Sequence, residues 1–304
     1  MTEAQEVTVR GPIDVMLVSD ANYSAFLATT IASILKNAAP DDELRFHIVD
    51  AGLEKSDRAA IKELKKIRSF EAIYYQPDLE EYAQYLCDDI STFPLVVNHR
   101  LFASSFLPED LDKIVYMDVD VVVLASLREL WNLPLNDYFV AAAPDHNMRL
   151  SHRRAIGLPE DFPYFNSGVL VMNLRKWRED KITEKLLPIA VEIKDNIDFP
   201  DQDVLNVYAH RNGFMELPEG WNVHPRDYVE GQTRLLHYMG SRHRCPHLDI
   251  LYDYTALTPY GQLPMQGLWY RIKRCCKRSV CNFLCFIFFP RKMRRAIRRR
   301  FNLR

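Results

Sequence analysis

The feature that most constrains this fold is a regular alternation of short apolar runs with helical patterns along the first half of the chain. The runs at residues 14–19 (DVMLVS), 44–49 (LRFHIV) and 71–75 (EAIYY) have the β-branched and aromatic content of buried strands. Apolar residues recur at helical spacing between them, over residues 27–35 and 61–67. Strands and helices that alternate in this way form βαβ units. We therefore expect an α/β fold with a mostly parallel, doubly wound central sheet flanked by helices.

Polar residues collect where the expected strands end. The remaining expected elements are strands at 113–117, 121–124, 139–143 and 168–173, a helix at 181–196 and a shorter helix after Asp201. Asp20 and Asn22 follow the first strand, and Asp118 follows the strand that ends at Met117. Ligands of such sheets bind beyond the carboxyl ends of the strands, so we expect the functional site at this edge.

Charge is unevenly distributed along the chain. It has 39 Lys and Arg against 41 Asp and Glu, a formal net charge of -2, yet 13 of the basic residues and none of the acidic ones follow Asp253. We expect a catalytic domain over residues 1–253, a linker rich in Pro, Gly and Thr over 254–266, and a basic tail over 267–304. An acidic body with a basic tail needs a polyanionic partner.

The tail interleaves its basic residues with aromatic ones, as in the run 283–289. This pattern suits a segment that lies on an anionic membrane surface. A solvated disordered tail and a nucleic-acid-binding tail are the alternatives. No nucleic-acid module accompanies the charge, so we expect no nucleic-acid partner.

The N-terminus, the apolar runs and the cysteines predict the cellular location of the protein. Residues 1–12 lack the apolar core of a signal peptide, and no run of about 18 apolar residues could span a bilayer. Cys87 and Cys245 stand alone in the body, which argues against a zinc site or a disulfide framework there. We expect a cytoplasmic protein with reduced cysteines, peripherally attached to the inner face of the cell membrane.

The sharpest local motif is Asp118-Val119-Asp120, between two apolar runs. Residues two apart on an extended strand point the same way, so both carboxylates can converge on one hard cation. The alternative is that they cap turns at the ends of the strands. Two carboxylates flanked by buried strands cost several kcal/mol unless a cation or hydrogen-bond donors compensate, and this favours metal binding.

Three further clusters allow a functional and a structural interpretation. Asp201-Gln202-Asp203 starts a helix, where Asp is a common cap, and for Asp201 we slightly favour that interpretation. His237 begins the run HYMGS and is either a metal ligand or a hydrogen-bonded structural histidine. The run 165–169 (FNSGV) forms either a polar turn that faces a ligand or a turn that starts a strand.

Taken together and in order, these motifs resemble those of the retaining family 8 glycosyltransferases, a family that includes glycogenin and bacterial lipo-oligosaccharide galactosyltransferases. The resemblance covers residues 13–245. The matching residues are DANY at 20–23, Arg100 in NHRLFA, YMDVDVVV around Asp118, Asp145, FNSGVLVMNLRKW at 165–177, DQDVLN at 201–206 and HYMGS from His237.

The resemblance implies a nucleotide-diphospho-sugar transferase fold of the GT-A type, a UDP-sugar donor, and Mn²⁺ or Mg²⁺ as the metal. Its implied metal ligands are Asp118, Asp120 and His237. The implied contacts to uracil and ribose are Val18, Asp20 and Asn22. The other implied donor contacts are Arg100, Val119, Asp145, Asn166, Ser167, Asp201, Gly240, Arg242 and His243. Gln202 and Asp203 are implied near the anomeric carbon, and these two with Asp145 are the expected catalytic residues.

One departure from the family concerns the diphosphate. The family often continues HxxGxxK, and here His243 stands in place of the lysine, flanked by Arg242 and Arg244. Arginine could supply the charge, and the sequence leaves open which residue does so.

The implied retention of configuration allows two routes. A carboxylate can attack to form a covalent glycosyl-enzyme, for which Asp203 is the candidate. Alternatively, the acceptor hydroxyl attacks from the face of the leaving group, and Gln202 then stabilises positive charge on the sugar.

The expected function is therefore transfer of galactose or glucose from a UDP-hexose to a lipid-linked saccharide acceptor, such as the core of lipopolysaccharide. A self-glycosylating enzyme like glycogenin is one alternative, and a non-catalytic protein that binds sugar nucleotides or membranes is another. The intact Asp118, Asp120 and His237 argue against the non-catalytic alternative.

Overall fold

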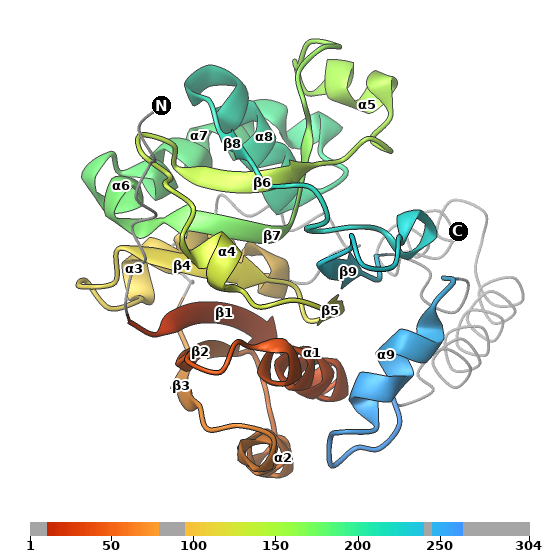
Figure 1. Cartoon of the computed structure of the whole chain (residues 1–304). Coiled ribbons are helices and arrows are strands. Elements are labelled where there is room, and N and C mark those ends of the chain that lie inside the picture. The colour runs from red at the N-terminus through yellow and green to blue at the C-terminus, as the bar shows by residue number, and fades with distance from the viewer. Residues whose placement is uncertain (1–10, 79–94, 240–244, 264–304) are drawn as a thin grey trace, which may run out of the picture. The chain divides into compact units, whose positions relative to one another are not determined.

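The computed structural model of the chain describes residues 11–78, 95–239 and 245–263 (Figure 1). The chain divides into two compact units, residues 1–262 and 263–304. The expected tail at 267–304 and three implied donor contacts, Gly240, Arg242 and His243, lie outside the described residues.

A seven-stranded sheet forms the centre of this unit (Figure 1), with the strand order β3-β2-β1-β4-β7-β6-β8. Its strands are β1 (Ile13–Ser19), β2 (Leu44–Asp50), β3 (Glu71–Tyr75), β4 (Lys113–Met117), β6 (Val140–Pro144), β7 (Phe165–Asn173) and β8 (Met215–Glu216). All neighbouring pairs are parallel except the two that involve β7, which runs antiparallel to β4 and to β6. The mostly parallel sheet predicted from the sequence is thus confirmed.

The run after the Asp118–Asp120 motif leaves this sheet. β5 (Val121–Val123) pairs antiparallel with β9 (Leu235–His237) in a separate two-stranded sheet, where Val121 lies opposite His237. The backbone N–H of Tyr238 donates to the carbonyl of Asp120 at 2.9 Å. This small sheet brings a residue from late in the chain beside the carboxylate motif.

Within the described residues, the four predicted helices are present, together with five that the sequence analysis did not predict. They are α1 (Ser24–Asn37), α2 (Lys55–Glu63), α3 (Ala103–Phe106), α4 (Arg128–Trp131), α5 (Leu150–Ala155), α6 (Leu174–Glu179), α7 (Ile182–Ile193), α8 (Pro200–Asn212) and α9 (Leu248–Thr255). Short 3₁₀ helices are η1 (Leu64–Lys66), η3 (Leu95–Phe102), η4 (Lys194–Asn196) and η5 (Pro225–Asp227). The helix after Asp201 is longer than expected, because α8 is buried on nearly all sides from Asp201 to Ala209 and lacks a one-sided apolar pattern.

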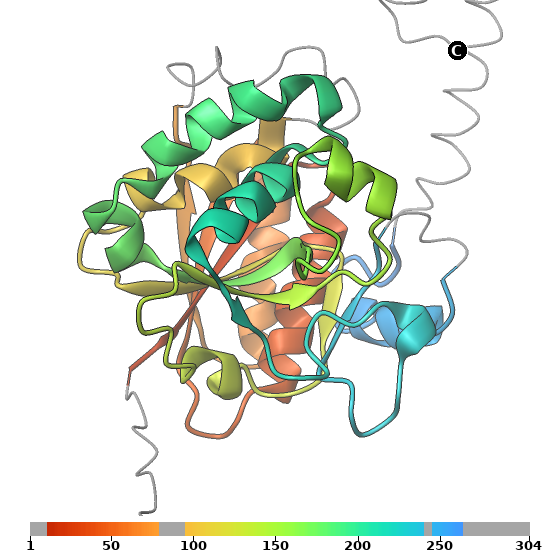
Figure 2. The same ribbon diagram turned by 90° about the horizontal axis from the view of Figure 1, so that it is seen from above.

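The sheet is covered on both faces (Figure 2). α1 packs against β1 on one face, whereas α6, α7 and α8 cover the other. On that second face Met16 and Tyr116 share a buried cluster with Trp177, Leu186 and Leu205. Among the helices that the structure describes, none is both long and apolar enough to cross a bilayer.

The start of the expected linker differs from the prediction. Tyr254 and Thr255 end α9, and the Tyr254 hydroxyl accepts a hydrogen bond from Nδ2 of Asn37 in α1 at 2.7 Å. Tyr260 donates its hydroxyl to Asp57 Oδ1 in α2 at 2.8 Å. The described part of residues 254–266 is therefore packed on the first unit, which continues to residue 262.

Candidate functional site

The antiparallel direction of β7 brings the residues of the candidate site together. Because β7 runs antiparallel to β4, its first residues lie beside the carboxyl end of β4, where Met117 pairs with Val169. The N–H of Asp118 donates to the carbonyl of Gly168 at 2.8 Å. The run FNSG is the start of strand β7, so the turn predicted for it is wrong. This run and the Asp118 motif, which are far apart in sequence, meet at the expected edge of the sheet.

Asp118, Asp120 and His237 come together at this edge. One potential ligand atom from each lies within 4.8 Å of the others. Nε2 of His237 is 3.2 Å from Oδ1 of Asp120 and 3.7 Å from Oδ2 of Asp118. The Asp118 side chain is 29% exposed, whereas that of His237 is 3% exposed. Two carboxylates and an imidazole that converge at a partly open position fit a divalent cation with room for further ligands.

His237 is held by a residue that the sequence analysis missed. Nδ1 of His237 lies 2.7 Å from Oδ1 of Asn222, which is buried and has a positive φ of 63°. With Nδ1 engaged in this bond, Nε2 is left to face the two carboxylates. Asn tolerates the left-handed backbone better than most residues, but this conformation is seen only in the structure, and nothing in the local sequence indicated a role for Asn222.

Asp118 is supported from inside the protein. Its Oδ1 accepts hydrogen bonds from Nη2 of Arg100 at 2.8 Å and from the hydroxyl of Tyr116 at 2.7 Å. The Arg100 guanidinium also lies over the Tyr116 ring, 4.3 Å from its centroid. Burial alone would lower the pKa of Arg100, but the charges of Asp118 and Asp201 outweigh it and raise that pKa, so the guanidinium stays charged.

Arg100 also organises Asp201 and Ser167. Its Nε lies 3.1 Å from Oδ2 of Asp201, and its Nη1 donates to the carbonyl of Ser167 at 2.6 Å. The Ser167 hydroxyl donates to the same Asp201 oxygen at 2.7 Å. Phe199 is the N-cap of α8, and Asp201 lies in the first turn of that helix, as the helix-terminus interpretation predicted. Its side chain also forms an ion pair with Arg100.

Gln202 and Asn166 form an amide pair in the same layer. Nδ2 of Asn166 and the backbone N–H of Ser167 both donate to Oε1 of Gln202 at 3.0 Å. Oδ1 of Asn166 accepts from the N–H of Gly168 at 2.9 Å. Arg100, Asn166 and Ser167, which are predicted donor contacts, also make bonds that support Asp118 and Gln202.

Asp203 is not placed to act as a nucleophile, which corrects its expected role. Its carboxylate is fully buried. One oxygen accepts from His152 Nε2 at 2.8 Å and from the Tyr164 hydroxyl at 2.6 Å. The other accepts from the backbone N–H groups of Asp198 and Phe199 at 3.0 and 2.9 Å. Four donors leave this carboxylate no free lone pair directed at a substrate.

The remaining predicted residues lie near the ends of neighbouring strands. Asp20 follows β1 and accepts bonds at 3.0 Å from both the N–H and Nδ2 of Asn22. Val18 and Val119 are buried, and the Val119 carbonyl accepts from the Thr30 hydroxyl at 2.8 Å. Asp145 follows β6 and is half-buried. These positions match the edge predicted for nucleotide and sugar binding.

Asn206 connects helix α8 to strand β7 at the site, a role that was not predicted for it. It is fully buried, its Oδ1 accepts from the N–H of Phe165 at 2.8 Å, and its Nδ2 donates to the Phe165 carbonyl at 2.9 Å. This pair of bonds fastens α8 to the start of β7. The available signal in the sequence was that Asn206 lies one helical turn after Gln202, on the same side of α8.

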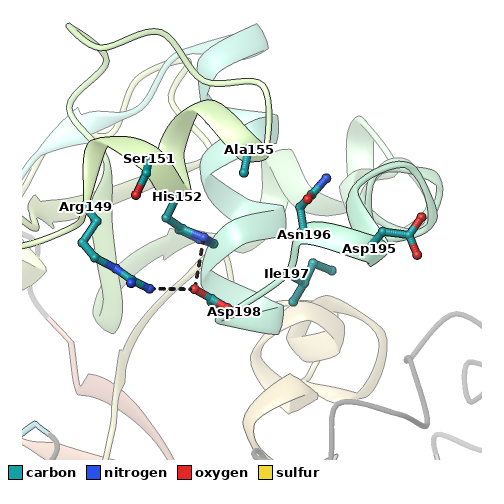
Figure 3. Close-up of a pocket in the computed structure, with 8 residues that line it drawn as sticks. All are labelled: Arg149, Ser151, His152, Ala155, Asp195, Asn196, Ile197 and Asp198. Carbon is teal, nitrogen blue, oxygen red and sulfur yellow. Dashed lines mark hydrogen bonds and ion pairs between the residues drawn. The ribbon is translucent and has the colours of Figure 1, made fainter.

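A pocket of about 310 Å³ lies beside His152, the residue that bonds to Asp203 (Figure 3). It is lined by Arg149, Ser151, His152, Ala155, Asp195, Asn196, Ile197 and Asp198. Asp198 pairs with Arg149 at 3.1 Å and with Nδ1 of His152 at 3.3 Å, as the dashed lines in Figure 3 mark. His152 thus stands between this pocket and the buried Asp203.

Comparison with known proteins agrees with this geometry. A lipopolysaccharide 1,2-glucosyltransferase of Escherichia coli is 32% identical over 238 residues, covering 73% of this chain and 69% of the relative. A lipopolysaccharide 1,3-galactosyltransferase of Salmonella typhimurium is 24% identical over 242 residues, covering 73% and 69%. The crystal structure of the galactosyltransferase LgtC with donor and acceptor sugar analogues is similar, with a TM-score of 0.70 and 26% identity. That match covers 84% of this chain and 98% of LgtC.

The sequence match extends over most of the chain. Residues 14–243 match the family model described as Glycosyl transferase family 8. The resemblance noted from the motifs is confirmed, and so is the likeness of the α/β fold to LgtC. With the strand ends, the Asp-Asp-His cluster and the family match in agreement, this chain belongs to glycosyl transferase family 8.

Proposed function

We propose that this protein is a metal-dependent retaining hexosyltransferase that moves galactose or glucose from a UDP-hexose to a lipid-linked saccharide, such as the core of lipopolysaccharide. The observation that carries the proposal is the cluster of Asp118, Asp120 and His237 at the carboxyl edge of the sheet. Relatives named as lipopolysaccharide glucosyl- and galactosyltransferases support the acceptor class.

The ligand set favours Mn²⁺ over Mg²⁺. Both ions accept carboxylate oxygens, but Mg²⁺ strongly prefers oxygen ligands and water, whereas an imidazole such as that of His237 suits a transition metal. A cation bound here would act as a Lewis acid and offset the charge that builds on the departing UDP. Asp118 and Asp120 would hold that cation, and the hydrogen bonds from Arg100 and Tyr116 orient the Asp118 side chain.

Retention is proposed to occur by attack of the acceptor from the face of the leaving group. Asp203, the candidate nucleophile, is buried and bonded to four donors, and Asp201 is held by Arg100 and Ser167. Gln202 would lie at the sugar, where its amide dipole stabilises developing positive charge. Its Oε1 already accepts two hydrogen bonds, which fix its direction.

The basic, aromatic tail is proposed to hold the enzyme at the inner face of the cell membrane. The support is its composition, with 13 Lys and Arg and no acidic residue after Asp253. Each basic side chain near an anionic surface contributes about 1 kcal/mol. This location would place the site next to a lipid-linked acceptor.

A donor screen tests the function. The full-length protein is incubated with UDP-galactose, UDP-glucose, UDP-N-acetylglucosamine or UDP-xylose, with Mn²⁺, with Mg²⁺ or with EDTA, and release of UDP is measured. We expect one UDP-hexose to be hydrolysed in Mn²⁺ and none in EDTA. Hydrolysis that is equally fast in EDTA contradicts the metal-dependent proposal. With an acceptor present, proton NMR must show an α-linkage for the transfer to be retaining.

A further inference from the structure

The candidate metal ligand His237 begins a chain of hydrogen bonds that crosses the interior of the site. The chain runs through His237, Asn222, Asn166, Gln202, Tyr164 and Asp203, and we call these six residues the relay. Nδ2 of Asn222 donates to Oδ1 of Asn166 at 3.0 Å, and Nδ2 of Asn166 donates to Oε1 of Gln202 at 3.0 Å. The relay joins a ligand on β9 to a carboxylate in α8.

Backbone groups determine the direction of every amide in the relay. A backbone N–H can only donate, so the atom of Gln202 that faces the N–H of Ser167 must be its oxygen. Likewise, the atom of Asn166 that faces the N–H of Gly168 must be its oxygen. Asn222 must then present its NH₂ to Asn166, which leaves its oxygen toward His237.

This order of donors fixes which nitrogen of His237 faces the two carboxylates. Since Oδ1 of Asn222 is an acceptor, Nδ1 of His237 is the donor in the bond between them. Nε2 is therefore the nitrogen that faces Asp120 and Asp118, at 3.2 and 3.7 Å. A ring held in this way presents Nε2 to a metal ion that the two carboxylates would bind.

The far end of the relay is anionic. Nε2 of Gln202 lies 3.1 Å from the Tyr164 hydroxyl, which donates to Oδ1 of Asp203 at 2.6 Å. Burial and the charge of Asp203 raise the pKa of Tyr164, so its hydroxyl remains a donor. All donors in the relay therefore point from His237 toward Asp203, and such a one-directional chain polarises each of its bonds.

We propose that Asn222 and Asp203 are positioning residues, which act through the relay to hold the His237 ring in the orientation that presents Nε2 to the metal. The arrangement extends the common pairing of a metal-bound histidine with a carboxylate by four intervening side chains. It gives a role to Asp203, whose buried carboxylate is not available as a nucleophile. This inference rests on the proposed metal-dependent function.

Mn²⁺ affinity, measured by electron paramagnetic resonance without any donor, tests the relay. Asn222→Gly removes the side chain at a positive φ that Gly adopts without strain, and we expect the Mn²⁺ dissociation constant to rise about 10- to 100-fold. Asn222→Asp can still accept from Nδ1 of His237 and should restore most of that affinity. If Asn222→Gly binds Mn²⁺ like the wild type, or Asn222→Asp restores nothing, the proposed bond to His237 is not what holds the ligand.

Tyr164→Phe breaks the relay at its far end and should raise the Mn²⁺ dissociation constant about two- to fivefold. Tyr260→Phe is the matched control, because it also removes a tyrosine-to-carboxylate bond, to Asp57, but lies off the relay. If these two variants have the same Mn²⁺ affinity, the relay does not extend to Asp203 and the proposal fails there.

A second measurement does not depend on metal binding. In metal-free protein labelled with ¹⁵N-histidine, the Nδ1–H proton of His237 should exchange slowly with solvent in the wild type and faster in Asn222→Gly, which lacks its acceptor. An unchanged exchange rate in that variant overturns the proposal. If the wild type itself binds no Mn²⁺, the proposed metal dependence fails, while the exchange experiment still tests the relay separately.

Discussion

The imidazole of His237 lies directly against the backbone of Gly168. A Cβ atom at Gly168 would be 2.1 Å from Cε1 of His237 and 2.8 Å from Oδ2 of Asp118. No side chain fits at this position while both candidate ligands keep their places. The backbone of β7 thus approaches the metal site as closely as a glycine allows.

Gly168→Ala is expected to displace His237 and Asp118 and to abolish Mn²⁺-dependent donor hydrolysis. Mn²⁺ binding and hydrolysis are the measurements. Gly231→Ala is a useful contrast, because its added Cβ meets open space but its φ of 75° strains an alanine. That variant should lose about 1 kcal/mol of unfolding free energy and keep Mn²⁺ binding. Normal Mn²⁺ binding by Gly168→Ala would contradict the prediction, because it would mean that His237 and Asp118 can move away from the added Cβ and still bind the ion.

Asp118→Asn and Asp120→Asn are both expected to abolish transfer, because each removes an anionic ligand. They should differ in stability. Asp118 neutralises the buried Arg100, so Asp118→Asn is expected to cost about 1–3 kcal/mol more unfolding free energy than Asp120→Asn. Urea unfolding of the metal-free proteins measures the difference. Equal stabilities would mean that Asp201 alone satisfies the guanidinium.

Asp203 is expected to form no glycosyl adduct. Intact-protein and peptide mass spectrometry after incubation with donor, without acceptor, should find Asp203 unmodified, because its oxygens are engaged by four donors. Asp203→Asn should lower the free energy of unfolding by about 1.5–3 kcal/mol, since it weakens bonds to a buried charged acceptor. An adduct at Asp203 would falsify the assignment of a positioning role.

Asp50 is expected to contribute to stability in a pH-dependent way. Burial alone would raise its pKa, but the N–H groups of Leu53 and Gly52 and the Arg58 guanidinium outweigh this and lower it. A lowered folded-state pKa stabilises the protein above the ordinary Asp pKa of about 3.9, and this contribution is lost as pH falls through the folded value.

Asp50→Asn should therefore lose about 1–3 kcal/mol of unfolding free energy at pH 7, and the difference from the wild type should shrink below about pH 4. Urea unfolding across a pH series measures it. Glu63→Gln, on an exposed pair with Lys66, is the control and should change stability by less than about 0.5 kcal/mol. A difference that stays constant with pH would contradict the role of the Asp50 charge.

Deleting residues 267–304 is expected to release the protein from anionic vesicles and to leave donor hydrolysis largely unchanged. The described site residues all precede this segment, and the basic cluster lies within it. Binding of the full-length protein should weaken as salt rises, because exposed charges are screened beyond about 8 Å at physiological ionic strength. Vesicle co-sedimentation across a salt series is the measurement. Equal sedimentation of the truncated protein would exclude the tail as the anchor.

The sequence alone was enough to predict the first strands of the sheet and the carboxylates at its carboxyl edge. Strand and helix periodicity is local, so β1, β2, β3 and β4 lie where the apolar runs predicted them. The i, i+2 spacing of Asp118 and Asp120 is also local and predicted that the two carboxylates converge. The predicted extended strand is wrong, because Val119 and Asp120 form a turn between β4 and β5. His237 could be assigned as the partner of these carboxylates only from the order of motifs along the chain, because nothing in its own surroundings marks it as a ligand.

Only the tertiary structure decided which partner each polar group has. Arg100, Asn166, Ser167 and Asp203 are polar residues in matching motifs, and each is hydrogen-bonded inside the protein. Several of their partners are 18 to 67 residues away and are brought near by the antiparallel placement of β7 and the packing of α8. A buried polar group must find its partner among whatever the fold brings near it, so its role follows from three-dimensional neighbours that local sequence does not encode.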